Sequence, residues 1–335
     1  MCRWIAYSGS PVSLDSLLFK PEHSLIDQSR HSRRGTPGAN PDKDHPAFFM
    51  NGDGVGVGWY SGSTWPGVYR DIQPAWNDRN LQNVAEHTTS GLFLAHIRAS
   101  SGSAIQQTNC HPFRHDRWLF QHNGEINNFP RLKRAIDLEI EPELYPLMEG
   151  STDSERMFFL ALTYGLMDNP RAALQKMVAH IEKIAQAESV PAPLVMTLAI
   201  SNGEQLFVVR YASPGNPPPS LYHNRSAHAI REIDGRNEQL PDDALIVLSE
   251  PIDEVSEHWE EVPEVDQPLG HRRGYAMSFV LGEREVRNLN RPVCRGRLEG
   301  TSSLHVSVSG GHVADPGSLE SRLLVQRLGR NDHFA

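Results

Sequence analysis

The second residue of the chain could act as a nucleophile. Cys2 directly follows the initiating methionine. Because cysteine is small, we expect an aminopeptidase to remove Met1 and leave Cys2 as the N-terminus. Such a residue carries a thiol beside a free α-amine, whose usual pKa of about 7.7–8.0 lets part of it act as a base at neutral pH. The alternative is a cysteine that only happens to follow the start methionine.

Two charged residues could bind the ends of a small zwitterion. Arg98 ends an apolar run at 92–98, and its planar guanidinium suits a carboxylate. Asp153 lies in the first turn of a predicted helix, where it could bind an ammonium group. Each has an ordinary alternative, because Arg98 could make a surface ion pair and Asp153 could simply favour the helix dipole.

An Asn-Gly pair could supply hydrogen-bond donors. Asn123 and Gly124 follow an apolar run at 118–122 that predicts a strand. We expect a turn that exposes the Asn123 amide and the Gly124 N–H side by side, and two such donors form an oxyanion hole. A plain Asn-Gly hairpin turn is the alternative.

Possible metal and phosphate sites carry weaker signals. Cys110, His111, His115 and His122 could ligate a metal, but their spacing matches no zinc pattern. We therefore expect no metal and no other cofactor. The glycine-rich run at 51–60 is a weak phosphate-loop candidate, since no Lys-Ser/Thr follows it and no helix begins there.

Composition restricts the class of protein and its partners. The chain has 335 residues, of which 39% are apolar, and its net charge is −9. The acidic balance argues against nucleic acid or an anionic membrane as the main partner. No apolar run reaches the length of a membrane span, and three cysteines cannot form a disulfide framework. We expect a cytoplasmic protein without a secretory signal.

The order of predicted elements indicates how these residues are positioned. Strands are expected at 2–8, 55–59, 92–98, 118–122, 194–201, 205–211, 244–249 and 275–281. Helices are expected at 78–89, after Thr152 and after Asn169. Strands come first, helices lie in the middle, and further strands follow. This order favours an α+β layered fold over a doubly wound parallel sheet.

Three local patterns make sharper predictions. Thr152 and Glu155 have the spacing of a capping box. Asn202-Gly203 between two β-rich runs predicts a hairpin with a type I′ turn. The alternation of glycine with apolar residues at 54–59 predicts a strand with one bare face, against which another segment packs closely.

The motifs are individually weak, but their order is specific. A second-position cysteine is followed by His-x-Arg at 96–98, Asn-x-His-Pro at 109–112, His-Asn-Gly at 122–124 and Thr-Asp-Ser-Glu at 152–155. This set resembles the class II glutamine amidotransferases, which are N-terminal-nucleophile hydrolases. The segments 1–11, 19–29, 51–60 and 108–115 are similar to the stand-alone subgroup. That subgroup includes γ-glutamyl amide hydrolases of the glutathione-degrading and ergothioneine-pathway types.

The resemblance implies a role for each candidate residue. Cys2 would be the nucleophile and its α-amine the base. Arg98 would pair with the α-carboxylate of the substrate, and Asp153 with its α-ammonium. Asn123 and the Gly124 N–H would hold the oxyanion.

The resemblance also implies the architecture. Residues 1–282 would form a four-layer αββα sandwich of two antiparallel sheets, followed by a weakly ordered tail at 283–335. One departure concerns the substrate pocket. Synthase members carry tryptophan after the arginine and threonine two residues later, whereas this chain has Arg98-Ala99-Ser100-Ser101. The leaving-group side of the pocket is therefore expected to differ from that of a glutamine-dedicated enzyme.

Three functions are compatible with these expectations. The first is an amidohydrolase that cleaves the γ-amide of glutamine or another γ-glutamyl compound, a small-molecule substrate, through a thioester on Cys2. The second is a glutaminase subunit that supplies ammonia to a separate partner chain, with a synthetase or a peptidase as the candidate partner. The third is a non-enzymatic ligand-binding relic of the fold. The presence of all five candidate residues argues against the third.

Overall fold

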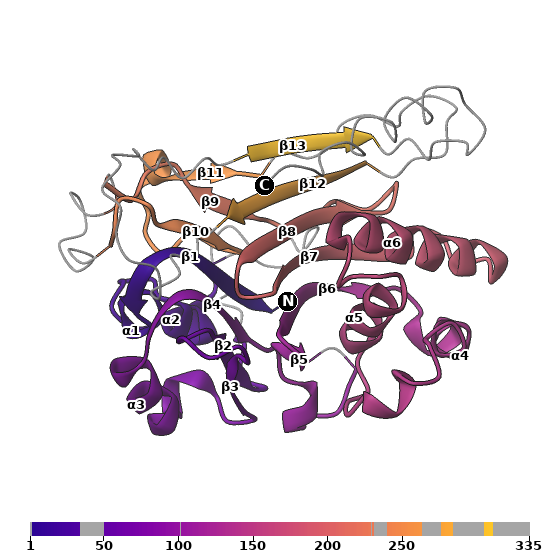
Figure 1. The fold of residues 1–335 in the computed structure, drawn as a ribbon, viewed down its shortest axis with the longest axis horizontal. Helices are drawn as coiled ribbons and strands as arrows, with labels where there is room; N and C mark the ends of the chain where they lie inside the picture. The colour runs from indigo at the N-terminus through magenta and orange to yellow at the C-terminus, as the bar shows by residue number, and fades with distance from the viewer. Residues whose placement is uncertain are drawn as a thin grey trace, which may run out of the picture.

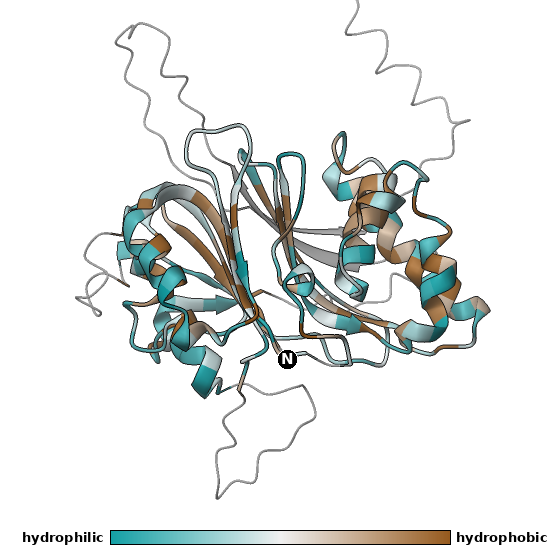
Figure 2. Ribbon diagram, turned by 90° about the horizontal axis from the view of Figure 1, so that it is seen from below, coloured by the Kyte–Doolittle hydropathy of each residue, from teal (hydrophilic) through white to brown (hydrophobic). Residues whose placement is uncertain are grey.

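Two antiparallel sheets lie face to face in the middle of the molecule. The computed structural model describes residues 2–33, 50–100, 102–228, 230 and 240–262, and the backbone of two strands at 276–283 and 305–310. Helices cover the outer face of each sheet (Figures 1 and 2). The expected αββα sandwich is confirmed, and every strand pair in the described part is antiparallel.

The first sheet contains the N-terminal strand at its centre. Its strand order is β11-β9-β10-β1-β4-β2-β3. The strands are β1 (Arg3–Ser13), β2 (Val55–Trp59), β3 (Gly67–Asp71), β4 (Thr89–Ile97), β9 (Tyr222–Asn224), β10 (Leu245–Leu248) and β11 (Trp259–Glu261). The helices on its side are α1 (Asp15–Leu18), α2 (Leu25–His31) and α3 (Arg79–His87).

The second sheet carries the longer helices. Its order is β13-β12-β8-β7-β6-β5. The strands are β5 (Phe113–His115), β6 (Trp118–Ile126), β7 (Leu194–Ser201), β8 (Gln205–Ala212), β12 (Ala276–Glu283) and β13 (His305–Gly310). The helices are α4 (Phe129–Asp137), α5 (Asp153–Thr163) and α6 (Pro170–Ala187). Short 3₁₀ helices are η1 (Ala75–Asn77), η2 (Gln107–Asn109), η3 (Tyr145–Leu147) and η5 (Ser256–His258).

The layers follow from the two-residue alternation of side chains in β1. Trp4 and Ala6 pack into the apolar layer between the sheets. Ile5 and Tyr7 point to the opposite face and pack in the layer under α1, α2 and α3. Because successive side chains of a strand face opposite ways, one strand contributes to both layers. A third apolar cluster lies between the second sheet and its helices.

The glycine-rich strand has the close neighbour that its sequence predicts. The segment that contains His111 and Pro112 lies against the bare face of β2. A Cβ added at Gly58 would lie 2.8 Å from Pro112 Cγ, and one added at Gly56 would collide with His111 O. The prediction of a bare-faced strand is confirmed, and this packing brings the Asn-x-His-Pro motif beside β2.

Both predicted helix caps form. Thr152 Oγ1 accepts a hydrogen bond from Glu155 N at 3.2 Å, and Asn169 Oδ1 accepts one from Ala172 N at 3.1 Å. The reciprocal half of the capping box does not form, because the Glu155 carboxylate accepts hydrogen bonds from the N–H groups of Glu149 and Gly150 instead.

The predicted hairpin forms between β7 and β8, but its turn differs. Ser201 pairs with Leu206, and Asn202 N donates to Gln205 O at 3.4 Å. The central residues are therefore Gly203 and Glu204, and only Gly203 has a positive φ, at 89°. A type I′ turn needs a positive φ at both positions, so that prediction is wrong. Glycine first is the pattern of a type II′ turn.

The predicted C-terminal tail can be compared with the structure only in part. Within 283–335 the structure describes β13, which pairs with β12. The rest of that segment after Glu283, including Cys294, lies outside the described residues. In the described part, no helix has the length and apolar character needed to cross a membrane.

Candidate active site

The thiol of Cys2 lies at the end of the neighbouring strand. Cys2 precedes β1, and its Sγ accepts a hydrogen bond from Ala99 N at 3.3 Å, just after β4. Burial raises the pKa of this thiol, although the Ala99 backbone and the charge of Arg98 act in the opposite direction. The thiol is therefore protonated at neutral pH and needs a base before it can attack a carbonyl.

Arg98 is a buried cation whose hydrogen-bond partners are neutral. Its side chain donates to Ser103 Oγ at 2.7 Å, Ala104 O at 3.1 Å and Ser100 Oγ at 3.2 Å. It also donates to the backbone oxygen of Asp53 at 3.4 Å. Among the described residues no carboxylate forms an ion pair with it, although the residue is only 3% exposed. A buried charge without a counter-ion is costly, so an anion bound beside this guanidinium would be stabilised.

Asn109 connects the Arg98 loop to the start of α5. Ala104 O accepts a hydrogen bond from Arg98 and a second, at 2.9 Å, from Asn109 Nδ2. Asn109 Oδ1 in turn accepts a hydrogen bond from Ser151 N at 2.8 Å. The sequence marked Asn109 only as part of a motif, and nothing in its local pattern indicated this connecting role.

Asp153 occupies the first position of α5, as predicted from the capping pattern. Its Oδ2 accepts a hydrogen bond from Ile126 N at 2.8 Å, and its Oδ1 accepts one from Ser154 N at 2.8 Å. The carboxylate is half-buried. Ser154 Oγ also donates to Oδ1, at 3.4 Å. A carboxylate has about four lone-pair sites, so these three hydrogen bonds still leave capacity for a ligand cation.

The predicted turn at Asn123-Gly124 is wrong. Both residues lie inside β6, which continues to Ile126 because β7 pairs with it along its length. Gly124 pairs with Met196 and has a φ of 147°. A Cβ at Gly124 would collide with Val195 O, so only glycine fits this conformation.

Two hydrogen-bond donors are nevertheless available on this stretch of β6. The Asn123 side chain is buried, its Oδ1 lacks a hydrogen-bond partner among the described residues, and no hydrogen bond there uses its Nδ2 donor. In an antiparallel strand the N–H and C=O of one residue point to the same edge, and successive residues point to opposite edges. Ile126 N and His122 O, two residues on either side of Gly124, both contact groups outside β7. The Gly124 N–H therefore faces the same edge, which β5 covers only between Trp118 and Phe120.

Asn123 is also tied to the N-terminal strand. Thr197, its partner across the β6–β7 ladder, donates through Oγ1 to Asn123 O at 3.4 Å. The same Oγ1 accepts a hydrogen bond from Trp4 Nε1 at 3.1 Å. Thr197 thus bridges the two sheets two residues away from Cys2.

Hydrogen bonds and short stretches of chain link four of the five candidate residues, Cys2, Arg98, Asp153 and Asn123, in a closed circuit; Gly124 lies on the stretch between Ile126 and Asn123. The circuit runs from Cys2 to Ala99 and Arg98, through Ala104, Asn109 and Ser151 to Asp153, then to Ile126 and Asn123, and back through Thr197 and Trp4. The structure therefore brings together residues that are up to 151 positions apart in the sequence. A thiol, a cation, an anion and an amide side chain thus belong to one connected set of contacts.

Three buried histidines lie beside this circuit. Burial lowers the pKa of His96 to about 3 and holds those of His111 and His122 below their usual value. The rings of His96 and His111 lie 4.2 Å apart, and His96 Nε2 contacts His122 O at 3.1 Å. All three are therefore neutral near pH 7. The described residues contain no cluster of His, Cys, Asp and Glu arranged to hold a metal ion.

Comparison with known proteins assigns the family. The sequence model of the class II glutamine amidotransferases matches residues 47–264 of the chain. The chain belongs to this family. The protein is accordingly an enzyme with hydrolase activity of the glutamine amidotransferase type, and the family predicted from the ordered motifs is confirmed.

Individual relatives agree with this assignment. The chain is 35% identical over 292 residues to the protein named "Probable glutamine amidotransferase DUG3" of Saccharomyces cerevisiae, covering 78% of this chain and 80% of that protein. It is 33% identical over 128 residues to the γ-glutamyl-hercynylcysteine sulfoxide hydrolase of Mycobacterium tuberculosis, covering 38% of this chain and 50% of the hydrolase. A solved glutamine aminotransferase class-II domain protein from Silicibacter pomeroyi aligns with a TM-score of 0.56 and 30% identity, over 84% of this chain and 98% of that one.

Proposed function

We propose that the enzyme hydrolyses the γ-amide of a γ-glutamyl substrate through a thioester on Cys2. The observation that carries this proposal is the buried guanidinium of Arg98, which lacks a carboxylate partner among the described residues and precedes the residue that contacts the Cys2 thiol. The substrate α-carboxylate supplies the missing anion. Asp153, on the opposite side of the circuit, supplies the negative charge for the substrate α-ammonium.

The chemistry uses the N-terminal residue as both base and nucleophile. After removal of Met1, the α-amine of Cys2 accepts the thiol proton, and the thiolate attacks the γ-carbonyl carbon. The Asn123 amide and the Gly124 N–H donate to the oxyanion that forms. The C–N bond then breaks, and the departing amine takes the proton from the α-ammonium. Water hydrolyses the γ-glutamyl thioester in the reverse sequence of proton transfers and releases glutamate.

The leaving group is the feature on which this enzyme is expected to differ from glutamine-dedicated members. Arg98 and Asp153 contact only the glutamate end of the substrate in this proposal. Alanine at position 99, where the synthases carry tryptophan, leaves room beyond the γ-amide. A larger leaving group adds binding contacts that can be used in the transition state. The sequence similarity to a γ-glutamyl-hercynylcysteine sulfoxide hydrolase agrees with an extended substrate.

A kinetic comparison tests the proposal. Glutamine, glutathione and other γ-glutamyl amides are supplied to the isolated enzyme, and glutamate release is measured. We expect a higher kcat/KM for an extended γ-glutamyl amide than for glutamine, and a transient adduct about 129 Da heavier than the free enzyme in intact-mass spectra. If glutamine is the best substrate, or if activity requires a separate synthetase or peptidase chain, the ammonia-supplying function replaces this one.

We also propose that the enzyme works in the cytoplasm on a small-molecule substrate. The mechanism requires Cys2 as a free thiol, which a reducing compartment preserves. The net charge of −9 makes nucleic acid and anionic membranes unfavourable partners. Cell fractionation with antibody detection tests this location, and recovery in a membrane or secreted fraction would contradict it.

A further inference from the structure

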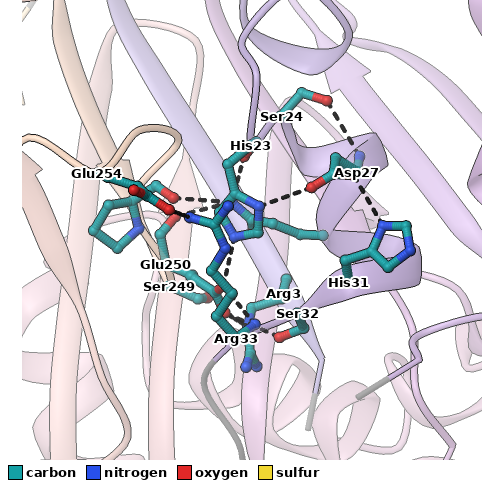
Figure 3. Close-up of polar contacts among 12 residues, drawn as sticks. Arg3, His23, Ser24, Asp27, His31, Ser32, Arg33, Ser249, Glu250 and Glu254 are labelled. Atoms are coloured by element: carbon teal, nitrogen blue, oxygen red, sulfur yellow. Dashed lines mark hydrogen bonds and ion pairs between the residues drawn. The ribbon is translucent and has the colours of Figure 1, made fainter. Parts of the chain in front are cut away.

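A buried network of charged side chains lies on the helix side of β1, directly next to Cys2. At its centre is Glu250, which follows β10 and is 2% exposed. One carboxylate oxygen accepts hydrogen bonds from Arg3 Nε at 2.7 Å and Ser32 Oγ at 2.9 Å. The other contacts His23 Nε2 at 2.6 Å and accepts a hydrogen bond from Arg33 N at 2.8 Å (Figure 3). Glu250 therefore joins β1 to the segment around α2.

The network continues through His23 to a second carboxylate. His23 Nδ1 contacts Asp27 Oδ2 at 2.8 Å, so each ring nitrogen faces a carboxylate oxygen (Figure 3). Burial alone would raise the pKa of Glu250, but the hydrogen bond from His23 and the charge of Arg3 outweigh it and lower that pKa to about 2. The carboxylate is thus ionised throughout the neutral range, and it holds the Arg3 guanidinium and the His23 ring.

Arg3 links this network to the nucleophile. Its Nη1 donates to Cys2 O at 2.8 Å, while its Nε is held by Glu250. The ladder between β1 and β4 begins at Arg3 and Ile97, so Cys2 lies outside it. An N-terminal residue has only one covalent neighbour, and its carbonyl and thiol need other contacts to hold them. The described contacts are the hydrogen bond from Arg3 to Cys2 O and those between Cys2 Sγ and the Ala99 backbone.

We propose that Arg3 is a positioning residue for the Cys2 nucleophile, and that the Glu250–His23 pair holds the Arg3 guanidinium where it fixes the Cys2 carbonyl. This inference rests on the proposed function, in which Cys2 supplies both the thiol and the base. Rotation about the Cys2 backbone would move the amine and the thiol relative to the substrate carbonyl. A misplacement of about 1 Å can cost on the order of 10²-fold in rate.

A purely structural role makes different predictions. If the network only clamps β1, β10 and α2 together, variants will lose stability but the folded fraction will react normally. If Arg3 positions Cys2, the folded variant will acylate slowly while substrate binding, which uses Arg98 and Asp153, is preserved. The two roles are therefore separated by the rate of acylation per folded molecule and by KM.

The test compares Arg3→Lys with Arg210→Lys in the full-length enzyme after removal of Met1. Arg210, in β8, is a matched control because it is also a buried arginine with backbone and carboxylate partners. It donates to the backbone oxygens of Pro219 and Val262 and forms an ion pair with Glu261 at 2.9 Å. The first readout is the burst of amine release from a chromogenic γ-glutamyl anilide. The second is the rate at which iodoacetamide alkylates Cys2 without substrate, followed by peptide mass, with buried Cys110 as an internal reference.

We expect Arg3→Lys to slow the burst on the order of 10²-fold with little change in KM, and to change the Cys2 alkylation rate. Arg210→Lys should leave both readouts at the wild-type level. Wild-type acylation and alkylation by Arg3→Lys, or equal losses in the two variants, would overturn the inference. If Arg3→Lys does not fold, the same measurements are made on His23→Gln, which leaves Arg3 and Glu250 in place. Slower acylation by this variant supports the inference, and an unchanged burst overturns it.

Failure of the proposed function gives a separate result. A wild-type enzyme that releases no amine from any γ-glutamyl compound would contradict the hydrolase mechanism. The alkylation rates would still show whether Arg3 controls the placement of the Cys2 thiol, because that reaction needs no substrate.

Discussion

The Asp153 carboxylate accepts a hydrogen bond from the backbone N–H of Ile126 at 2.8 Å. This contact attaches the N-terminus of α5 to the end of β6, three residues after Asn123. It gives one carboxylate two tasks, because the same group is proposed to bind the α-ammonium of the substrate. Helix and strand are thereby held in a fixed relationship beside the proposed substrate site.

Asp153→Asn separates these two tasks. The amide oxygen can still accept the hydrogen bond from Ile126, whereas the negative charge is lost. We expect Tm to change little and kcat/KM for γ-glutamyl amides to fall at least about tenfold, since an ion pair in a desolvated site is replaced by a neutral contact. The control substrate is a glutaryl amide, which lacks the α-amino group. The wild-type preference for γ-glutamyl over glutaryl should largely disappear in the variant, and a preserved preference would contradict the assignment.

Asn123→Ala removes one of the two proposed donors to the oxyanion. Because that donor acts on charge that develops only in the transition state, kcat should fall on the order of 10²–10³-fold with KM nearly unchanged. Steady-state kinetics on the best γ-glutamyl amide measure both constants. An effect on KM alone would show that Asn123 binds the ground state and not the oxyanion.

Removal of Met1 should be required for turnover. The proposed base is the α-amine of Cys2, which exists as a free amine only after this removal. Intact mass and activity are measured on the same preparations, and activity should scale with the fraction that lacks methionine. Cys2→Ala should fold normally and lose activity, because this thiol contributes little to packing. Full activity with Met1 attached would exclude the terminal amine as the base.

The buried histidines should make the fold sensitive to mild acid. Burial lowers the pKa of His96 to about 3, below its usual value of 6.5, and those of His111 and His122 are lowered too. The unfolded chain therefore binds more protons than the folded one below pH 6.5. The stabilisation is fully present above that pH and is lost as the pH falls toward the folded-state values.

Urea denaturation between pH 7 and pH 4.5 measures this effect. The free energy of unfolding should decrease by up to about 1.4 kcal/mol per pH unit for each histidine that titrates only in the unfolded state. His96→Gln, whose amide can still donate to His122 O, should reduce the slope by about one proton. A flat profile from pH 7 to pH 5 would contradict the neutral state assigned to these residues.

The amino-acid sequence by itself determined most of the local structure. Some features act only over a few neighbouring positions, so the sequence around them predicts their effect. They are the alternation of side chains in β1, the glycines of β2 and the capping residues Thr152 and Asn169. The ordered motifs likewise indicated which residues belong to one site. Their chemistry follows from residue type, and a thiol, a cation, an anion and an amide have few joint uses.

Tertiary structure alone decided how those residues meet. Asn123-Gly124 has the composition of a turn, yet pairing with β7 keeps it inside a strand, because a ladder of backbone hydrogen bonds outweighs a local turn preference. Arg3 and Glu250 are 247 positions apart, and neither carries a local signal for the other. Their contact depends on the register of β1 against β10, which the packing of the whole sheet selects. Local patterns specify elements, whereas long-range partners arise only when those elements pack together.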